Sequence, residues 1–471
     1  MKPNAIETDY LVIGGGAAAM AFVDTLISEQ HDATVVMVDR HHRPGGHWND
    51  AYPFVRLHQP SNWYGVASRE LGQGNKDTGG FNIGHYGLAS GAEILAYFDH
   101  VLQQHLLPTG RVRWFPMSEY RPGTGGEHQV VPLMGGDMRQ VLVRKKVVDA
   151  THAATEVPST HPPRYALAEG VKCIPLNGLP QVSRAYANYT VVGSGKTGMD
   201  AAVWMLENGV PPERIRWIRP RDAWFMNRAN LQPGLENFER SMGSTVTEFD
   251  AITEATSVAD LFARLEHSEQ LLRIDPTVQP TTYRCATVSQ GELAQLRRIQ
   301  DVVRMGRVRS IEKSRLVLDQ GSLPADPDTL YIDCSASAIV KPRPLPTFDG
   351  ERINLLLMRA CQPMCSAAVL AWVESNVEDE AQKQALCTVL PSPELPLDWL
   401  RMWVGTIENT ARWRQNPGLT AWLSKCRLNA AAVYMRGVTP EDTEKLALAR
   451  SVGVKSGAAL ARGKALLASA E

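Results

Sequence analysis

The chain lacks an excess of charge of either sign. Among its 471 residues, Lys and Arg total 49 and Asp and Glu total 50, which leaves a net charge of −1 with neutral histidine. Such a chain has no overall positive field for a phosphate backbone, so a general nucleic-acid binder is disfavoured.

Long apolar runs are also lacking. The first one, Leu11 to Val23, is interrupted by three glycines and is too short to span a bilayer. The N-terminus has acidic Glu7 and Asp9 before any apolar run, unlike a signal peptide. We therefore expect a cytoplasmic protein with no membrane contact.

Cysteine is sparse and unpatterned. The sequence has 7 cysteines and no CxxC pair. We expect these side chains to behave as small, buried, apolar groups, and we expect no metal site. The positions concerned are Cys173, Cys285, Cys334, Cys361, Cys365, Cys387 and Cys426.

The strongest local signal that is present lies near the N-terminus. An apolar β-type run, Tyr10 to Ile13, leads into Gly14-Gly15-Gly16 and then into a helix-forming run with Ala19 at the last position of a GxGxxG pattern. Gly14 permits the tight turn, and Gly16 leaves room for a pyrophosphate against bare backbone. The helix start offers unpaired N–H groups to that anion. The pyrophosphate ligands expected here are Gly14, Gly16, Ala17 and Ala18.

A second strand, Ala33 to Val38, ends in Asp39, with Arg40 beside it. A carboxylate at this place accepts hydrogen bonds from a ribose diol and repels a 2′-phosphate. The first unit therefore suits FAD or NAD better than NADP, with Asp39 and Arg40 at the ribose.

A second unit of the same kind begins with the strand Tyr189 to Val192. The full pattern Gly193-Ser194-Gly195-Lys196-Thr197-Gly198 follows, then a helix from Lys196 to about Leu206 and a strand from Ile215 to Ile218. That strand ends in Arg219, with Arg221 two residues further, and guanidinium groups there can pair with a 2′-phosphate. The second unit therefore predicts NADPH, bound by Gly193, Ser194, Gly195, Lys196, Thr197, Arg219 and Arg221. A P-loop is disfavoured because Thr190 stands where its opening glycine is required.

Two units of opposite 2′-preference suggest hydride transfer from NADPH to a flavin between two domains. With the segments Gly45-Gly46-His47-Trp48 and Tyr52-Pro53, the chain resembles the flavin-containing monooxygenases and Baeyer–Villiger monooxygenases. The resemblance implies an α/β protein with two Rossmann-like domains. A discontinuous FAD domain would occupy 1–155 and 329–471, the latter with a helical tail. An NADPH domain would occupy 156–328, with a helical insertion at about 225–300.

The resemblance also assigns residues around the flavin. Gly46, His47 and Trp48 would form the loop at the flavin ribityl chain, and His58, Gln59 and Asn62 would lie near the reacting ring. A helix that opens at Gln362-Pro363-Met364 would point its positive end at the flavin pyrimidine, through Gln362 and Met364. If His58 faces the flavin, its charge would make oxygen activation depend on pH.

Two departures from the family pattern point to a divergent branch. His58 stands where Baeyer–Villiger enzymes carry an acid, and residues 151–188 contain no FxGxxxHxxxW fingerprint. Ketone oxygenation is therefore disfavoured, and the chemistry of the related N-hydroxylating amine oxygenases stays open.

The leading hypothesis is an FAD- and NADPH-dependent monooxygenase, which transfers one oxygen atom from O2 to a small organic substrate through a flavin C4a-(hydro)peroxide. The alternative is an NADPH-dependent flavoprotein reductase or dehydrogenase without oxygen transfer. Its disulfide-reductase form is disfavoured because the first 170 residues hold no cysteine pair. A cofactor-bound protein without catalysis is the third reading. The tail, 400–471, offers solvated faces or a contact between identical subunits.

Overall fold

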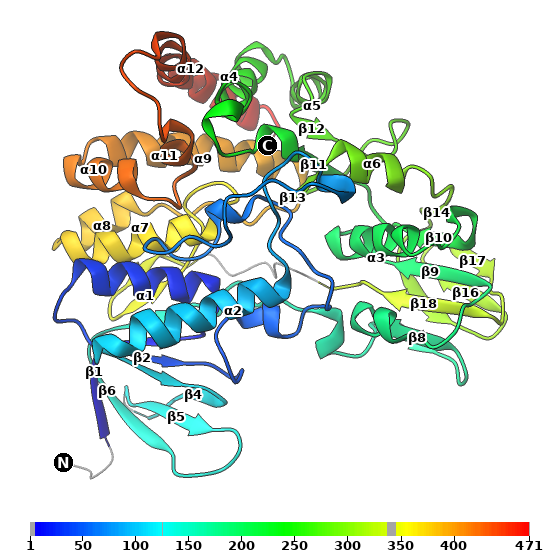
Figure 1. The fold of residues 1–471 in the computed structure, drawn as a ribbon, viewed down its shortest axis with the longest axis horizontal. Coiled ribbons are helices and arrows are strands. Elements are labelled where there is room, and N and C mark those ends of the chain that lie inside the picture. The colour runs from blue at the N-terminus through cyan, green and yellow to red at the C-terminus, as the bar shows by residue number, and fades with distance from the viewer. Residues whose placement is uncertain (1–4, 125, 337–344, 471) are drawn as a thin grey trace.

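The protein is an α/β structure with two main sheets, the first mixed with a parallel centre and the second parallel, and a helical cap (Figure 1). The computed structural model describes residues 5–124, 126–336 and 345–470. Each sheet carries one glycine turn between a strand and a helix, so the predicted fold class is confirmed.

The first sheet has parallel strands at its centre and is discontinuous in sequence. Strand β1 pairs in parallel with both β2 and β6, and β20 pairs in parallel with β6. The chain thus leaves this sheet after β6 and returns to it some 200 residues later, at β20. In spatial order the strands are β19 (Phe348–Asp349), β20 (Arg352–Asn354), β6 (Arg139–Asp149), β1 (Ala5–Ile13), β2 (Val35–Val38) and β3 (Val112–Phe115). Strand β5 (His128–Pro132) also pairs with β6, and β4 (Ser118–Pro122) pairs with β5.

Three helices cover this sheet. Helix α1 (Ala17–Glu29) packs along α7 (Pro363–Asn376), so segments that are far apart in the sequence meet in one core. Helix α2 (Gly91–Val101) begins with a capping box, in which the side chains of Ser90 and Glu93 accept hydrogen bonds from each other's backbone N–H groups.

The second sheet is parallel throughout. Its strands stand in the order β14 (Asp301–Val303), β10 (Ile215–Ile218), β9 (Asn188–Val192), β18 (Thr329–Asp333) and β8 (Lys172–Pro175). Helix α3 (Lys196–Glu207) follows β9. A smaller sheet lies beside it, made of β17 (Gly321–Pro324), β16 (Arg315–Leu318), β15 (Val308–Ile311) and β7 (Ala166–Leu167).

The insertion at 225–300 is only partly helical, which corrects the expectation. It contains the helices α4 (Phe238–Glu254), α5 (Val258–His267) and α6 (Gln290–Leu296). It also forms a sheet of β12 (Leu271–Leu272), β11 (Ala223–Asn227) and β13 (Thr282–Val288). The segment 293–303 resembles one amphipathic helix, but α6 ends at Leu296 because the chain then joins β10 as the edge strand β14.

The tail is helical as predicted. Helix α12 (Thr443–Ala468) packs against α4 and α9, so insertion and tail form one cap above α7 (Figure 1). The other helices of the tail are α8 (Glu380–Leu386), α9 (Pro396–Arg414), α10 (Pro417–Lys425) and α11 (Ala430–Met435). In the described part of the chain, no helix has the length and apolar character needed to cross a membrane.

The expectation for the cysteines is wrong at one pair. Cys285 on β13 and Cys361, just before α7, form a disulfide across 76 positions of sequence. Folding brings their Cα atoms to 5.7 Å, which is within the span that a disulfide requires. Of the rest, Cys173 is half-buried, and the four buried free thiols, as expected, are Cys334, Cys365, Cys387 and Cys426.

Candidate active site

The first glycine turn and the loop 45–48 touch each other through bare backbone. Gly14 has a φ of +99°, and its N–H donates to the carbonyl of Val38 at 2.7 Å. Gly16 caps α1, and the N–H of Gly45 donates to the carbonyl of Gly15 at 2.8 Å. A Cβ on Gly46 would lie 3.0 Å from the Cα of Gly16. The structure thus brings the predicted ligands at Gly14, Gly16, Ala17, Ala18 and Gly46 to one place, at the N-terminus of α1.

Gly15 and His41 hold Asp39 beside this turn, and the role of His41 was not predicted from the sequence. Its carboxylate accepts hydrogen bonds from the N–H of Gly15 and, at 2.7 Å, from the N–H of His41. The His41 ring lies 2.8 Å from Asp39 and 2.9 Å from Asp50. The hydrogen bond with Asp39 raises the pKa of His41 to about 9, so the ring is positive at pH 7 and offsets the carboxylate's charge. Arg40 is exposed.

Within the loop 45–48, Trp48 supports the loop from inside. Its indole N–H donates to the hydroxyl of Tyr64 at 2.6 Å, and the ring is buried. His47 is exposed beside it. The two residues were predicted to act together in one loop, but Trp48 is buried in the protein interior and His47 faces solvent.

In the second glycine turn the three glycines have different roles. A Cβ on Gly193 would lie 2.7 Å from the carbonyl oxygen of Cys334, and one on Gly198 would lie 2.2 Å from that of Gly193. These two glycines are needed for strand and helix to pack. A Cβ on Gly195 would meet nothing within 4 Å, so the space in front of α3 is open. Ser194 and Thr197 are half-buried at its edge.

Lys196 of this turn belongs to a network of charged side chains that joins α3 to other segments of the chain. Its ammonium group pairs with Asp200 and lies 3.5 Å from Glu292. Glu292 also pairs with Arg228 at 2.7 Å, and Asp200 accepts a hydrogen bond from the hydroxyl of Tyr52. Burial acts to lower the pKa of Lys196, but Asp200 and Glu292 outweigh it and hold that pKa above its usual value. No spacing pattern in the sequence identifies this network, because Tyr52, Arg228 and Glu292 are distant from Lys196 along the chain.

His58 lies against the same network. Its Nδ1 accepts from the N–H of Thr287 at 3.3 Å, and its carbonyl accepts from Nε of Arg228 at 2.9 Å. Burial, then the positive charges of Lys196 and Arg228, lowers the pKa of His58 to about 3. This geometry predicts a neutral ring from pH 5 to 9, which removes the reason for expecting pH-dependent oxygen activation through His58.

The low pKa of His58 also predicts acid sensitivity. Between pH 3 and 6.5 the unfolded state holds more protons at this site than the folded state, so stability is lost as the pH falls. The cost is at most about 1.4 kcal/mol per pH unit. We expect His58→Gln to flatten the pH dependence of denaturant unfolding between pH 6.5 and 4.5. His31→Gln, at an exposed histidine, should keep the wild-type slope; equal slopes in both variants would contradict the assignment.

The other residues predicted near the flavin separate into two groups. Gln59, Gln362 and Met364 line one cavity of about 280 Å³ beneath the helical cap. Gln362 caps α7, and Pro363 occupies the first turn as predicted. Asn62 does not line this cavity; its amide donates to the carboxylate of Glu70.

The two arginines predicted to bind the 2′-phosphate differ in their exposure to solvent. Arg219 is 2% exposed, pairs with Asp222 and lies 4.8 Å over the ring of Trp217. Arg221 has 38% of its side chain exposed and lies 3.3 Å from Glu394, which Arg284 approaches at 3.7 Å. Arg221 and Arg284 are therefore the more accessible cations near this strand end, and Arg284 carried no signal in the sequence.

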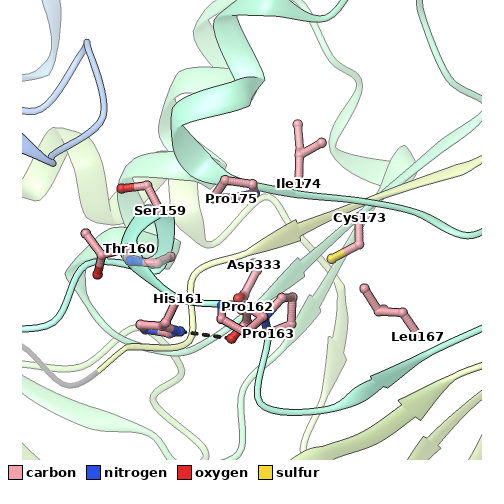
Figure 2. A pocket seen from close by; sticks show the side chains of 11 residues that line it. Ser159, Thr160, His161, Pro162, Pro163, Leu167, Cys173, Ile174, Pro175 and Asp333 are labelled. Atoms are coloured by element: carbon pink, nitrogen blue, oxygen red, sulfur yellow. Dashed lines mark hydrogen bonds between the residues drawn. The ribbon is translucent and has the colours of Figure 1, made fainter.

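A second cavity, of about 450 Å³, lies at the carboxyl ends of β8 and β18 (Figure 2). His161 and Asp333 border it, and the Nδ1 of His161 is 3.0 Å from the carbonyl of Pro162. Ligands of parallel sheets bind at this end of the strands.

Comparison with solved structures identifies the fold class. A steroid monooxygenase, solved in its oxidized form bound to NADP, is 15% identical with a TM-score of 0.53, over 78% of this chain and 85% of that one. A flavin monooxygenase of Stenotrophomonas maltophilia is 14% identical with a TM-score of 0.48, over 81% of this chain and 100% of that one. The chain shares its fold with this steroid monooxygenase, in keeping with the resemblance that its motifs carry.

No family model matches the sequence. The uncharacterized protein Rv2000 of Mycobacterium tuberculosis is 52% identical over 432 residues, which are 91% of this chain and 79% of that protein. The uncharacterized protein Mb2023 of Mycobacterium bovis matches to the same extent. The chain belongs to the family of these mycobacterial proteins.

Proposed function

We propose that the protein is an FAD- and NADPH-dependent monooxygenase that transfers one oxygen atom from O2 to a small organic substrate. The observation that carries the proposal is the pair of glycine turns, each at the carboxyl end of a parallel strand, joined across the lobes by the Tyr52–Asp200–Lys196 contact. When bound, NADPH supplies a hydride and the flavin accepts it and reacts with O2.

The residues at the first turn fit FAD. The N-terminus of α1 and the facing backbone of Gly16 and Gly46 suit a pyrophosphate, and Asp39 suits a ribose diol. At the start of α7, Oε1 of Gln362 is buried and has no hydrogen-bond partner in the described part of the chain. An acceptor that is orphaned in this way fits a bound group with an N–H to donate, such as a flavin pyrimidine.

The second turn fits NADPH. The open space at Gly195 leaves room for a pyrophosphate at the N-terminus of α3. Arg221 and Arg284 are the accessible cations assigned to the 2′-phosphate, while Arg219 pairs with Asp222 and supports the strand end. The Lys196 network holds the turn against the loop that carries His58 and Gln59, so the two cofactor sites keep a common orientation.

The experiment that tests the function follows the purified, FAD-loaded protein by absorbance. We expect NADPH to bleach the flavin without oxygen, and oxygen to restore its colour. With substrate present, oxygen uptake should match NADPH oxidation with little hydrogen peroxide released. Bleaching with peroxide as the only oxygen product would favour the reductase alternative, and failure to bind FAD would overturn both.

Arg221 provides a test of the NADPH preference. We expect Arg221→Ala to raise the KM for NADPH by roughly tenfold or more, because a charge-assisted contact with phosphate is lost, and to leave the KM for NADH unchanged. Arg214→Ala, at the exposed opposite end of β10, is the matched control and should change neither value. An equal loss with both nucleotides would mean that Arg221 does not contact the 2′-phosphate.

A further inference from the structure

We propose that the cavity at the start of α7 receives a small organic cation and that Glu248 holds its charged end. This inference rests on the proposed function only in taking that cation to be the substrate. It concerns how the substrate is recognised and makes no statement about which atom is oxidised.

Glu248 is the only acidic side chain among the described residues that line this cavity. It projects from α4, in the insertion, whereas Gln362 and Met364 line the same cavity from the start of α7. A ligand that fills about 280 Å³ can therefore reach both the carboxyl group and the predicted flavin side.

The carboxyl group of Glu248 has no hydrogen bond or ion pair within residues 5–124, 126–336 and 345–470. Burial alone raises its pKa to about 8, and no nearby cation counteracts that effect. Glu248 is half-buried, and a cation is the group that would compensate a carboxyl group that has lost part of its water and has no partner.

The remaining walls suit a cation with an apolar body. Five aromatic side chains line the cavity, and the faces of such rings attract ammonium groups. Burial first, and then the negative charge of ionised Glu248, raises the pKa values of Tyr283 and Tyr434. The aromatic residues are Trp63, Phe249, Tyr283, Trp403 and Tyr434.

Two arginines also line the cavity, but neither neutralises Glu248. Nη1 of Arg359 donates to Oδ1 of Asn429 at 2.6 Å, and Arg414 is exposed at the end of α9. If either guanidinium lay beside Glu248, it would lower the pKa of that carboxyl group, and only burial acts on it. The carboxyl group is therefore free for a ligand's charge.

Trp63 also lines the cavity, and its indole Nε1 is buried with no hydrogen-bond partner among the described residues. Buried polar groups in native proteins are nearly always hydrogen-bonded, and a bound molecule or water would complete this one.

The test is calorimetric titration of the FAD-loaded protein at pH 7 with three molecules of similar shape: phenethylamine, 2-phenylethanol and phenylacetate. We expect the amine to bind about tenfold more tightly than the alcohol, or better, and the anion to bind worst. Titrations in two buffers of different ionisation enthalpy should show the release of nearly one proton with the amine, because Glu248 must ionise.

Glu248→Gln should abolish both the preference for the amine and the proton release. Glu239→Gln makes the same substitution at an exposed site in the first turn of α4 and should behave as wild type. Equal affinity of wild type for amine and alcohol, or binding without proton release, would overturn the proposal even if the Glu248 variant fails to fold.

The outcome for the cation site is separable from that for the proposed function. Amine binding by a protein whose flavin NADPH does not bleach would refute the monooxygenase and leave the cation site standing. Flavin reduction by NADPH with no amine preference would refute the cation site alone.

Discussion

Replacing Gly46 with alanine is expected to reduce the FAD content of the purified protein by about tenfold or more. Gly46 has a φ of +56°, and an added Cβ would lie 3.0 Å from the Cα of Gly16. The substituted residue would strain the loop and push it away from the α1 turn, where the proposed pyrophosphate must fit against both backbones. The ratio of flavin to protein absorbance measures the effect.

The control for this substitution is Gly74→Ala. Gly74 has a similar φ, of +68°, but a Cβ there meets nothing within 4 Å. It reproduces the backbone strain without the close approach, so its FAD content should stay near that of wild type. If both variants lose FAD equally, general destabilisation explains the result; if Gly46→Ala keeps its FAD, the contact between the two loops does not form the site.

The second large effect is expected on opening the Cys285–Cys361 disulfide. The bond joins positions 76 residues apart and ties β13 of the insertion to the loop that enters α7. Its loss should destabilise the folded protein by roughly 2–4 kcal/mol, because the unfolded chain regains freedom. We expect dithiothreitol or Cys285→Ser to lower the melting temperature by several degrees, and titration of the native protein to gain two thiols on reduction.

The double variant Cys285→Ser, Cys361→Ser separates the bond from other effects of reductant. Its melting temperature should be the same with and without dithiothreitol. Cys173→Ser, at a half-buried free thiol, should melt and respond to reductant as wild type does. A wild-type protein that shows all 7 thiols without reductant would contradict the disulfide. Because Cys361 also lines the cavity with Glu248, reduction should weaken amine binding as well.

Much of the cofactor architecture could be predicted because its determinants are local. A strand, a glycine turn and a helix start occupy about a dozen consecutive residues, and the need for bare backbone at Gly14 or Gly193 is visible in the pattern itself. The capping box of Ser90 and Glu93 was predictable for the same reason, since its partners are three residues apart.

The side chains of the site were less predictable. The protonation of His58 depends on Lys196 and Arg228, which come from other segments. Arg219 is buried and paired with Asp222, and the pattern at the strand end does not reveal this pairing. The segment 293–303 has a helical pattern, yet its end becomes β14, because pairing with β10 satisfies the backbone there.

The sequence by itself therefore determined the two dinucleotide-type units and their order, since short-range patterns of glycine and apolar residues specify them. Only the tertiary structure decided the Cys285–Cys361 bond, the neutral state of His58 and the cavity that isolates Glu248. Each of these depends on burial and on contacts between residues far apart in the chain, and those exist only once the cap has packed over α7.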